Sequence, residues 1–202
     1  MRFKTWPVAA AALAGLLLLV VVSVLAASRR AQEIYTQLDQ LNAHHRDVDA
    51  ELRTLRSDVN LSGIFLRDYL LDTSRERAPE YRDQLAEFRR TNMETLKELG
   101  RLTRGTAGVG YDRLPGLQAK LDEYWLTFEP LFDWTPSEKI SESARFVRHD
   151  LLPPRQAVLT IAREIEELNN ANLAAEHREV ERRLAVFRRD LHSLLWRSLL
   201  LG

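Results

Sequence analysis

The chain has 202 residues, and its 29 Lys and Arg residues are balanced by 29 Asp and Glu residues. Without a basic excess, the composition gives no support to nucleic-acid binding, and we expect no nucleic-acid partner. The absence of cysteine excludes disulfides, thiolate metal sites, haem attached through a C-x-x-C-H motif and a cysteine nucleophile.

An uncharged apolar segment covers residues 8–27. About twenty residues at 1.5 Å rise per residue match a hydrocarbon core roughly 30 Å thick, so this segment is predicted to be a transmembrane helix. A cleaved secretory signal has a shorter apolar region and a small-x-small cleavage site. In this chain Leu25 occupies a position where that site requires a small residue. Basic residues flank both ends, so charge alone leaves the orientation open.

Apolar residues then recur in alternating steps of four and three for about five heptads. The seam consists of Ile34, Leu38, Leu41, His45, Val48, Leu52, Leu55, Val59, Ser62, Leu66 and Tyr69. This spacing predicts one long helix, ending at about Asp72, that packs along its length against near-parallel neighbours. Gly63 is expected to be a close-packing site within that helix, and His45 a polar core residue that fixes the register.

A second helix is expected to start either at Pro79 or at a capping box formed by Thr73 and Glu76. Its seam is Tyr81, Leu85, Phe88, Asn92, Thr95, Leu99 and Leu102. A third helix is expected to begin at Asp112 as N-cap and to weaken at Pro130. Its seam is Leu114, Leu117, Leu121, Tyr124, Phe128 and Leu131.

The motif "TPSE" at 135–138 combines an N-cap, a first-turn proline and a capping-box glutamate, and predicts another helix start. Its inward residues are expected to be Ile140, Ala144, Val147 and Leu151. "LLPPR" is expected to force a turn, because Pro153 disfavours helical geometry at Leu152. The last helix is expected to run from Pro154 towards the C-terminus.

Amphipathic helices with short connections predict an all-α fold, a membrane-anchored antiparallel four-helix bundle with long first and last helices. The expected organisation is a cytoplasmic N-terminus at 1–7, a transmembrane helix at 8–27, an extracytoplasmic four-helix-bundle sensor domain at 28–190, and the start of a truncated second transmembrane helix at 191–202. The tail "LHSLLWRSLLLG" is too short to span a bilayer. Its alternative is an amphipathic helix with Trp196 at the headgroup level.

Two stretches resemble a known class of protein: "SGIFLRDYLLDTSRERAPEYRDQLAEF" and "RFVRHDLLPPRQAVL". Together with the helix order, they resemble the extracytoplasmic four-helix-bundle sensor modules of bacterial transmembrane sensor histidine kinases and methyl-accepting chemotaxis receptors. The resemblance implies signal transduction from a bundle on the periplasmic or extracellular side of the bacterial inner (cytoplasmic) membrane. It also implies a cytoplasmic output domain, of a two-component kinase or a chemoreceptor, that lies outside these residues. Because the seams exceed what one bundle must bury, we expect a homodimer.

No catalytic constellation is found, so these residues are not expected to form an enzyme. Glu51–Thr54 matches part of the Glu-Leu-Arg-Thr-Pro motif of histidine kinases, but Ala50 precedes it where the phosphoacceptor His belongs, and Leu55 replaces the proline. The histidines lack the paired Glu-x-x-His arrangement of metal sites in bundles, so no metal or cofactor is expected.

Aromatic residues gather in "YWLTFEPLFDW", where the alternatives are core packing and a pocket for a ligand or partner. Arginines near the distal loops would either bind carboxylates or form surface ion pairs. The candidate ligand-binding residues are Arg67, Tyr69, Tyr124, Trp125, Trp134, Arg148 and Arg155. The pattern does not identify the partner as a small molecule or a periplasmic protein, and the rival function is a membrane-tethered adaptor or structural protein without signalling output.

Overall fold

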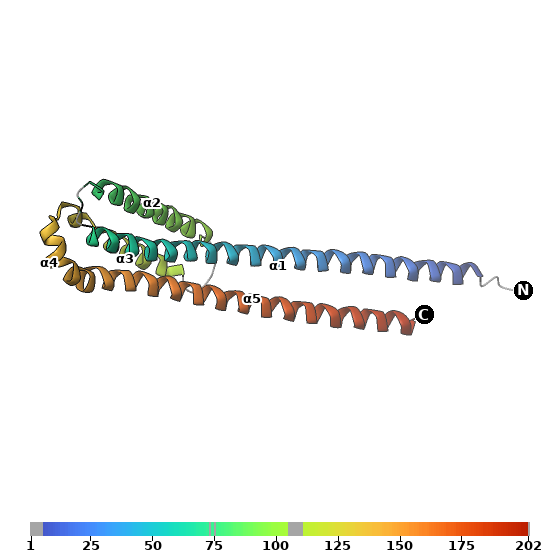
Figure 1. The fold of residues 1–202 in the computed structure, drawn as a ribbon. Helices are drawn as coiled ribbons and strands as arrows, with labels where there is room; N and C mark the ends of the chain where they lie inside the picture. Colours follow the sequence, from blue (N-terminus) through green and yellow to red (C-terminus); the bar gives the residue numbers. More distant parts are fainter. Residues whose placement is uncertain (1–5, 73, 75, 105–110, 202) are drawn as a thin grey trace, which may run out of the picture. The chain divides into compact units, whose positions relative to one another are not determined.

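The computed structural model describes residues 6–72, 74, 76–104 and 111–201. These residues are helical apart from short connections and contain no strand, which confirms the all-α class. The helices are α1 (Trp6–Leu71), α2 (Ala78–Leu102), α3 (Leu114–Leu126), α4 (Pro136–Phe146) and α5 (Leu152–Leu201), with 3₁₀ segments η1 (Tyr111–Arg113) and η2 (Glu129–Asp133) and a π-helical segment η3 (Val147–Leu151) (Figure 1). The chain forms two compact units, residues 44–172, here called the core unit, and residues 1–43 with 173–202, here called the terminal unit.

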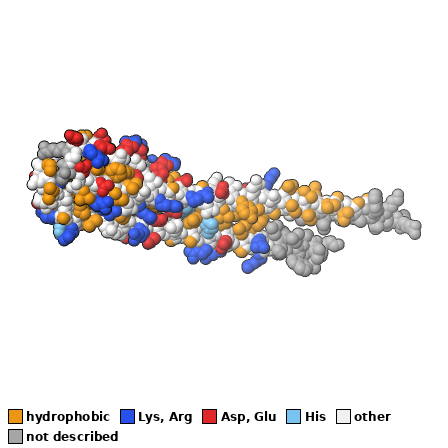
Figure 2. All heavy atoms as spheres, viewed as in Figure 1, with side chains coloured by type: hydrophobic (Ala, Val, Ile, Leu, Met, Phe, Trp, Pro, Cys, Tyr) orange, Lys and Arg blue, Asp and Glu red, His pale blue; other side chains and the backbone are white. Residues whose placement is uncertain are grey.

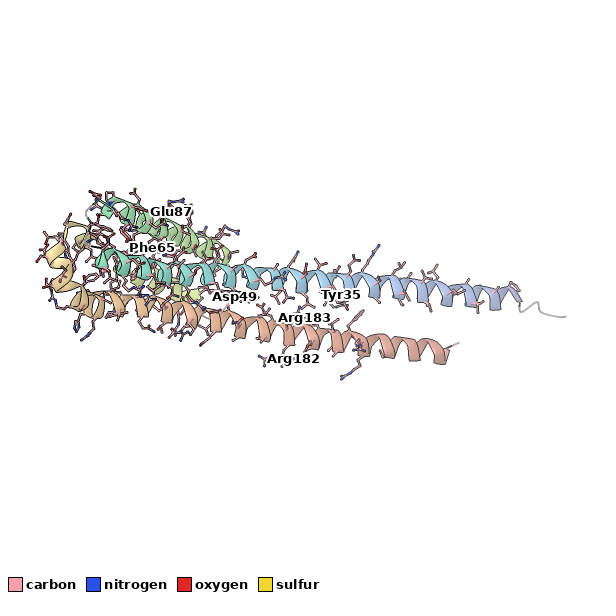
Figure 3. All side chains as sticks on the ribbon, in the orientation of Figure 1. Tyr35, Asp49, Phe65, Glu87, Arg182 and Arg183 are labelled. Carbon is pink, nitrogen blue, oxygen red and sulfur yellow. The ribbon has the colours of Figure 1, made fainter. Side chains whose placement is uncertain are left out.

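The first helix ends one residue before the predicted Asp72 and is uninterrupted at Gly63. Within the core unit the predicted seam is confirmed, because eight successive seam positions are buried. They are His45, Val48, Leu52, Leu55, Val59, Ser62, Leu66 and Tyr69. Side chains from the other helices pack on this seam and its flanks. Phe88 of α2, for example, meets Phe65 of α1 with ring centroids 5.5 Å apart; Phe65 is labelled in Figure 3.

The helix starts agree with the sequence in two of the predicted cases. Pro79 lies in the first turn of α2, as predicted, whereas Thr73 lies outside the described residues. Thr135 and Glu138 form the predicted capping box of α4: the Glu138 N–H donates to Thr135 Oγ1 at 3.3 Å, and the Thr135 N–H donates to Glu138 Oε2 at 2.7 Å.

The predicted N-cap at Asp112 is wrong. Asp112 lies inside η1, and α3 begins at Leu114 after Arg113, which has helical backbone angles and no side-chain cap. A side-chain N-cap needs an extended backbone. Because η1 continues directly into α3, Asp112 lies within a helical segment and lacks the extended backbone that an N-cap requires.

The predicted inward residues of the segment after Thr135 are only half right. Leu151 is buried and Val147 packs against the core, but both lie in η3; within α4 the prediction is wrong, since Ile140 is 76% exposed and Ala144 is exposed. Lys139 and Phe146 are buried instead. This helix has only 11 residues and lies beyond the end of α1 (Figure 1). Its buried face is therefore set by contacts at the end of the core, which heptad spacing does not describe.

The predicted turn at "LLPPR" is replaced by a widened helical turn. Leu152 has helical angles, φ −63° and ψ −41°, and its N–H donates to the Val147 carbonyl five residues earlier. Both prolines fall in the first turn of α5, directly after the π-turn, and neither has a backbone N–H that would need a carbonyl partner. The extra residue of the π-turn gives the chain room for the proline rings without a loop.

A buried polar cluster joins α1 to α5 in the core unit. Asn169 is fully buried. Its Oδ1 lies 2.7 Å from His45 Nδ1 and also accepts a hydrogen bond from the Tyr111 hydroxyl at 3.0 Å. Its Nδ2 donates to the His45 carbonyl at 3.2 Å and to Asp49 Oδ1 at 2.9 Å. His45 is thus the polar core residue that the sequence predicts, and its partner is only available in one alignment of the two helices.

A second buried polar contact joins α1 to α3. The Tyr124 hydroxyl lies 2.9 Å from Ser62 Oγ and donates to the Val59 carbonyl at 3.2 Å. Burial raises the pKa of Tyr124 to about 12, although the hydrogen bond with Ser62 and the charge of Arg155 partly oppose the shift. The neutral hydroxyl is therefore retained well above neutral pH.

In the terminal unit, no described side chain is fully buried. Within the apolar segment 8–27 of α1, large apolar side chains are more than half exposed: Leu13, Leu17, Leu18, Val21, Val22, Val24 and Leu25. Figure 2 shows hydrophobic side chains gathered along this part of the helix. The most apolar part of this helix has a mean hydropathy of 1.9 and meets the length and composition of a membrane span, criteria that a signal sequence near an N-terminus also meets. The structure does not describe residues 1–5, which form most of the predicted cytoplasmic N-terminus. In the predicted second span, 191–202, it describes the side chain of Ser193 but not the other side chains.

The predicted close-packing role of Gly63 is confirmed by Arg155 of α5. A Cβ added at Gly63 would lie 3.1 Å from Arg155 Nε, and Arg155 Nη2 donates to Asn60 Oδ1 at 2.7 Å. The guanidinium therefore lies against the α1 backbone where the side chain is missing. Gly100 of α2, by contrast, has no heavy atom within 4 Å of an added Cβ.

We predict that Gly100→Ala raises the free energy of unfolding by about 0.5–1 kcal/mol, whereas Gly63→Ala raises it less or lowers it. The cause is the shift that the new methyl group imposes on Arg155. In an Arg155→Ala background, Gly63→Ala should raise the free energy of unfolding by as much as Gly100→Ala does. Denaturant unfolding of the four variants measures this, and equal effects of Gly63→Ala in both backgrounds would contradict the proposed contact.

Candidate functional site

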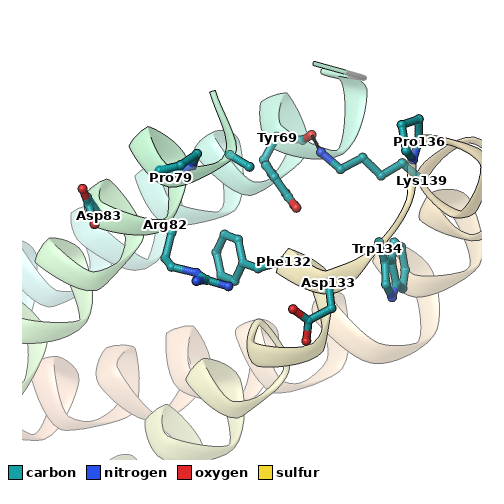
Figure 4. A pocket seen from close by; sticks show the side chains of 10 residues that line it. Tyr69, Pro79, Arg82, Asp83, Phe132, Asp133, Trp134, Pro136 and Lys139 are labelled. Atoms are coloured by element: carbon teal, nitrogen blue, oxygen red, sulfur yellow. Dashed lines mark hydrogen bonds between the residues drawn. The ribbon is translucent and has the colours of Figure 1, made fainter. Parts of the chain in front are cut away.

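Two hollows lie at the end of the core unit where α1 ends and α2 begins. We call the first, of about 560 Å³, the tip cavity. It is lined by Tyr69, Ala78, Pro79, Arg82, Asp83, Phe132, Asp133, Trp134, Pro136 and Lys139 (Figure 4). We call the second, of about 330 Å³, the side groove. It is lined by Arg82, Leu85, Ala86, Arg89, Trp125, Phe128, Glu129 and Phe132.

Lys139 closes the inner wall of the tip cavity. The side chain is 4% exposed, and its ammonium donates to the Tyr69 carbonyl at 3.1 Å and the Asp72 carbonyl at 3.0 Å. The Tyr69 carbonyl belongs to the last turn of α1 and Asp72 directly follows that helix, so both carbonyls lie where intrahelical donors are lacking. The ammonium also lies 3.5 Å from the centroid of the Tyr69 ring. Burial lowers the pKa of Lys139, and Asp72 partly opposes this shift.

The tip cavity combines aromatic faces with charges of both signs. The Tyr69 ring packs against Phe132 with centroids 5.2 Å apart, and the Tyr69 hydroxyl donates to the Leu131 carbonyl at 3.0 Å. Burial raises the pKa of Tyr69, while the charge of Arg82 lowers it and that of Asp133 raises it. Two opposite charges therefore act on one aromatic surface.

Arg82 and Phe132 stand at the border of the two hollows and line both. The guanidinium carbon of Arg82 lies 4.9 Å from the centroid of the Phe132 ring, within the range of a cation–π contact (Figure 4). No carboxylate in the described part of the chain forms an ion pair with Arg82. The guanidinium thus keeps its hydrogen-bond donors available to a ligand.

The side groove has an apolar wall and a charged rim. Trp125 and Phe128 meet edge to face with centroids 5.1 Å apart, and Trp125 meets Tyr124 at 5.3 Å. On the rim, Arg89 Nη1 lies 3.4 Å from Glu129 Oε1. Trp125 is 2% exposed, and its Nε1–H has no acceptor among the described residues.

The aromatic candidates from the sequence divide between these hollows and the core. Tyr69 and Trp134 both line the tip cavity, and Trp125 lines the side groove. Tyr124 is fully buried and lines neither. Its role as a ligand contact stays a prediction, and its observed contacts are those of a core residue.

The arginine candidates lie elsewhere in the core unit. Arg67 is exposed and pairs with the neighbouring Asp68 at 3.4 Å. Arg148 is exposed on η3, and Arg155 packs on Gly63. None of the three lines the tip cavity or the side groove, so the structure does not bring them together with the aromatic candidates.

Sequence reasoning missed Arg82, Phe132 and Lys139 as lining residues. Phe132 lies within the aromatic stretch that drew attention to this region, so that signal was available. Arg82 follows the seam residue Tyr81 directly, a position that heptad spacing marks as surface. Lys139 was missed because the inward face of α4 was assigned to Ile140.

Charged and aromatic side chains line both hollows. Among the described residues, no group of three or more His, Cys, Asp or Glu side chains could hold a metal ion. The tip cavity and side groove hold guanidinium, carboxylate and aromatic groups in an arrangement suited to orienting a small molecule. The buried ammonium of Lys139 is engaged by backbone carbonyls.

We predict that Lys139→Met lowers the free energy of unfolding by about 1–3 kcal/mol, because the buried Tyr69 carbonyl and the partly buried Asp72 carbonyl lose their donor. Ile140→Met, one residue further along α4 and at a 76% exposed position, should change it by less than about 0.5 kcal/mol. Denaturant unfolding compares the two. Equal stability of both variants would remove Lys139 from its role at the end of α1.

Comparison of the chain with protein-family models, with curated proteins and with solved structures gives no match.

Proposed function

We propose that this chain is the extracytoplasmic sensing and transmembrane signal-transduction module of a bacterial receptor, of the two-component sensor histidine kinase class. In this proposal residues 8–27 cross the bacterial inner membrane, and the core unit is a four-helix bundle on the periplasmic side. Ligand binding to the bundle moves the membrane-crossing helices relative to each other and passes the signal to a cytoplasmic output domain.

The observation that carries the proposal is the uninterrupted course of α1. The helix contains the apolar segment 8–27, the charged stretch that begins at Ser28, and the seam buried in the core unit. Neither proline nor a break in hydrogen bonding separates these parts. A continuous helix transmits a shift or rotation along its axis, whereas a flexible hinge would absorb it.

The core unit supplies the features that a sensor needs. Its helices share one core, and two hollows with available polar groups lie at the end where α1 stops. A ligand that binds better to one of two closely matched helix packings shifts the population towards that packing. The polar cluster around Asn169 joins α1 to α5 in one alignment, and a change of alignment would break its hydrogen bonds.

A stimulus-independent experiment tests transmission through α1. We would complete the second span by adding a transmembrane helix after Gly202, followed by a cytoplasmic reporter kinase, and insert one to four alanines after Ala27. Each inserted alanine rotates the following helix by about 100°, so reporter activity should vary periodically with the number of residues. Insertion of Gly-Gly-Gly, matched to Ala-Ala-Ala in length, should remove this coupling. Reporter activity that is the same in every variant would favour a membrane-tethered adaptor without signalling output.

We further propose that the module is a homodimer whose partner covers the terminal unit. There the seam residues of both helices are only partly buried: Ile34, Leu38 and Leu41 on α1, and Leu173, Val180, Leu184 and Phe187 on α5. Continuous seams on helices of this kind are usually buried against neighbouring helices. A second copy offers the same seams in matching register.

Because the chain has no cysteine, single introduced cysteines report this contact directly. We predict that Leu38→Cys forms a disulfide-linked dimer under mild oxidation in membranes. Gln40→Cys, on the exposed side of the same turn, should form little disulfide-linked dimer. Equal cross-linking of the two variants, or none from Leu38→Cys, would contradict a dimer along this seam.

A further inference from the structure

We propose that the side groove binds an amphipathic monocarboxylate, a small organic acid with an aromatic or branched aliphatic body. This inference rests on the proposed sensory function and names the ligand class for it. The volume of the side groove, about 330 Å³, lies at the lower end of the range for small-molecule sites. A ligand of roughly the size of a substituted aromatic acid therefore fits.

The charges of the groove favour an anion. Three charged side chains line it, Arg82, Arg89 and Glu129, and the pairing of Arg89 with Glu129 leaves Arg82 as the excess charge. The planar guanidinium can donate two parallel hydrogen bonds to one carboxylate. The guanidinium carbon lies 4.9 Å from the centroid of the Phe132 ring, and this contact holds Arg82 beside the apolar lining of the groove.

The remaining lining is apolar and suits the body of the ligand. It comprises Leu85, Ala86, Trp125, Phe128 and Phe132. The contacts of Trp125 with Tyr124 and Phe128 give this wall a fixed shape.

The tip cavity is less suited to an anion, although it shares Arg82 with the groove. Asp83 and Asp133 also line it and would repel a carboxylate. Figure 4 shows the Arg82 guanidinium against Phe132, at the border between the two hollows. We therefore place the carboxylate at this border and the body of the ligand on the groove side.

The first test compares three probes of one shape on the full chain in detergent: 3-phenylpropionate, 3-phenylpropionamide and 3-phenylpropylamine. Calorimetric titration should show binding of the acid, with the neutral amide at least about tenfold weaker. The acid should also raise the melting temperature. Equal binding of acid and amide, preferential binding of the amine, or no binding of the acid would overturn the proposal.

Matched variants then locate the site. Arg82→Gln should weaken binding of 3-phenylpropionate by about 10- to 100-fold. Arg90→Gln, with the same charge change on the same helix but outside both hollows, should leave it unchanged. Ala86→Trp, at an exposed position, should fill the groove and abolish binding while the melting temperature without ligand stays that of the parent. Equal affinities of Arg82→Gln and Arg90→Gln would overturn the assignment.

These measurements separate the ligand class from the sensory function, because binding requires no output domain. Loss of phase-dependent reporter activity together with intact, Arg82-dependent binding would reject signalling and retain the site. Phase-dependent reporter activity in a protein that does not bind the acid would reject the site and retain signalling.

Discussion

The core unit depends on one constraint, the burial of a single face of α1. Every described helix of that unit contributes to the core that this face helps to form. The seam is mostly apolar, but His45 and Ser62 interrupt it with groups that require partners on α5 and α3 respectively. Apolar burial supplies most of the stabilisation without direction, while the two polar contacts restrict how the helices can be aligned.

The same constraint explains how much could be predicted from the sequence. The seam of α1 was predictable because it extends over many turns, so that the heptad period is unambiguous. The capping box at Thr135 was predictable because it depends only on neighbouring residues. The inward face of α4 could not be predicted, since a short helix at the end of a core is oriented by particular contacts, here those of Lys139 with the end of α1.

The candidate site was predictable only in its neighbourhood. The aromatic stretch indicated the region, and Tyr69, Trp125 and Trp134 do line hollows there. Arg82 could not be selected, because its sequence position resembles that of every other exposed arginine on α2. Its distinguishing features, the stacking on Phe132 and the lack of a carboxylate partner among the described residues, arise only when α2 and η2 meet.

The π-turn at Val147–Leu151 determines more than the path of the chain around the two prolines. An α-helix that gains or loses one residue rotates all later side chains by about 100° about its axis. Asn169 faces His45 only for one such angular setting of α5. The number of residues in this widened turn therefore sets the rotation of the last helix about its own axis. That rotation places its polar and apolar side chains opposite the matching positions of the first helix.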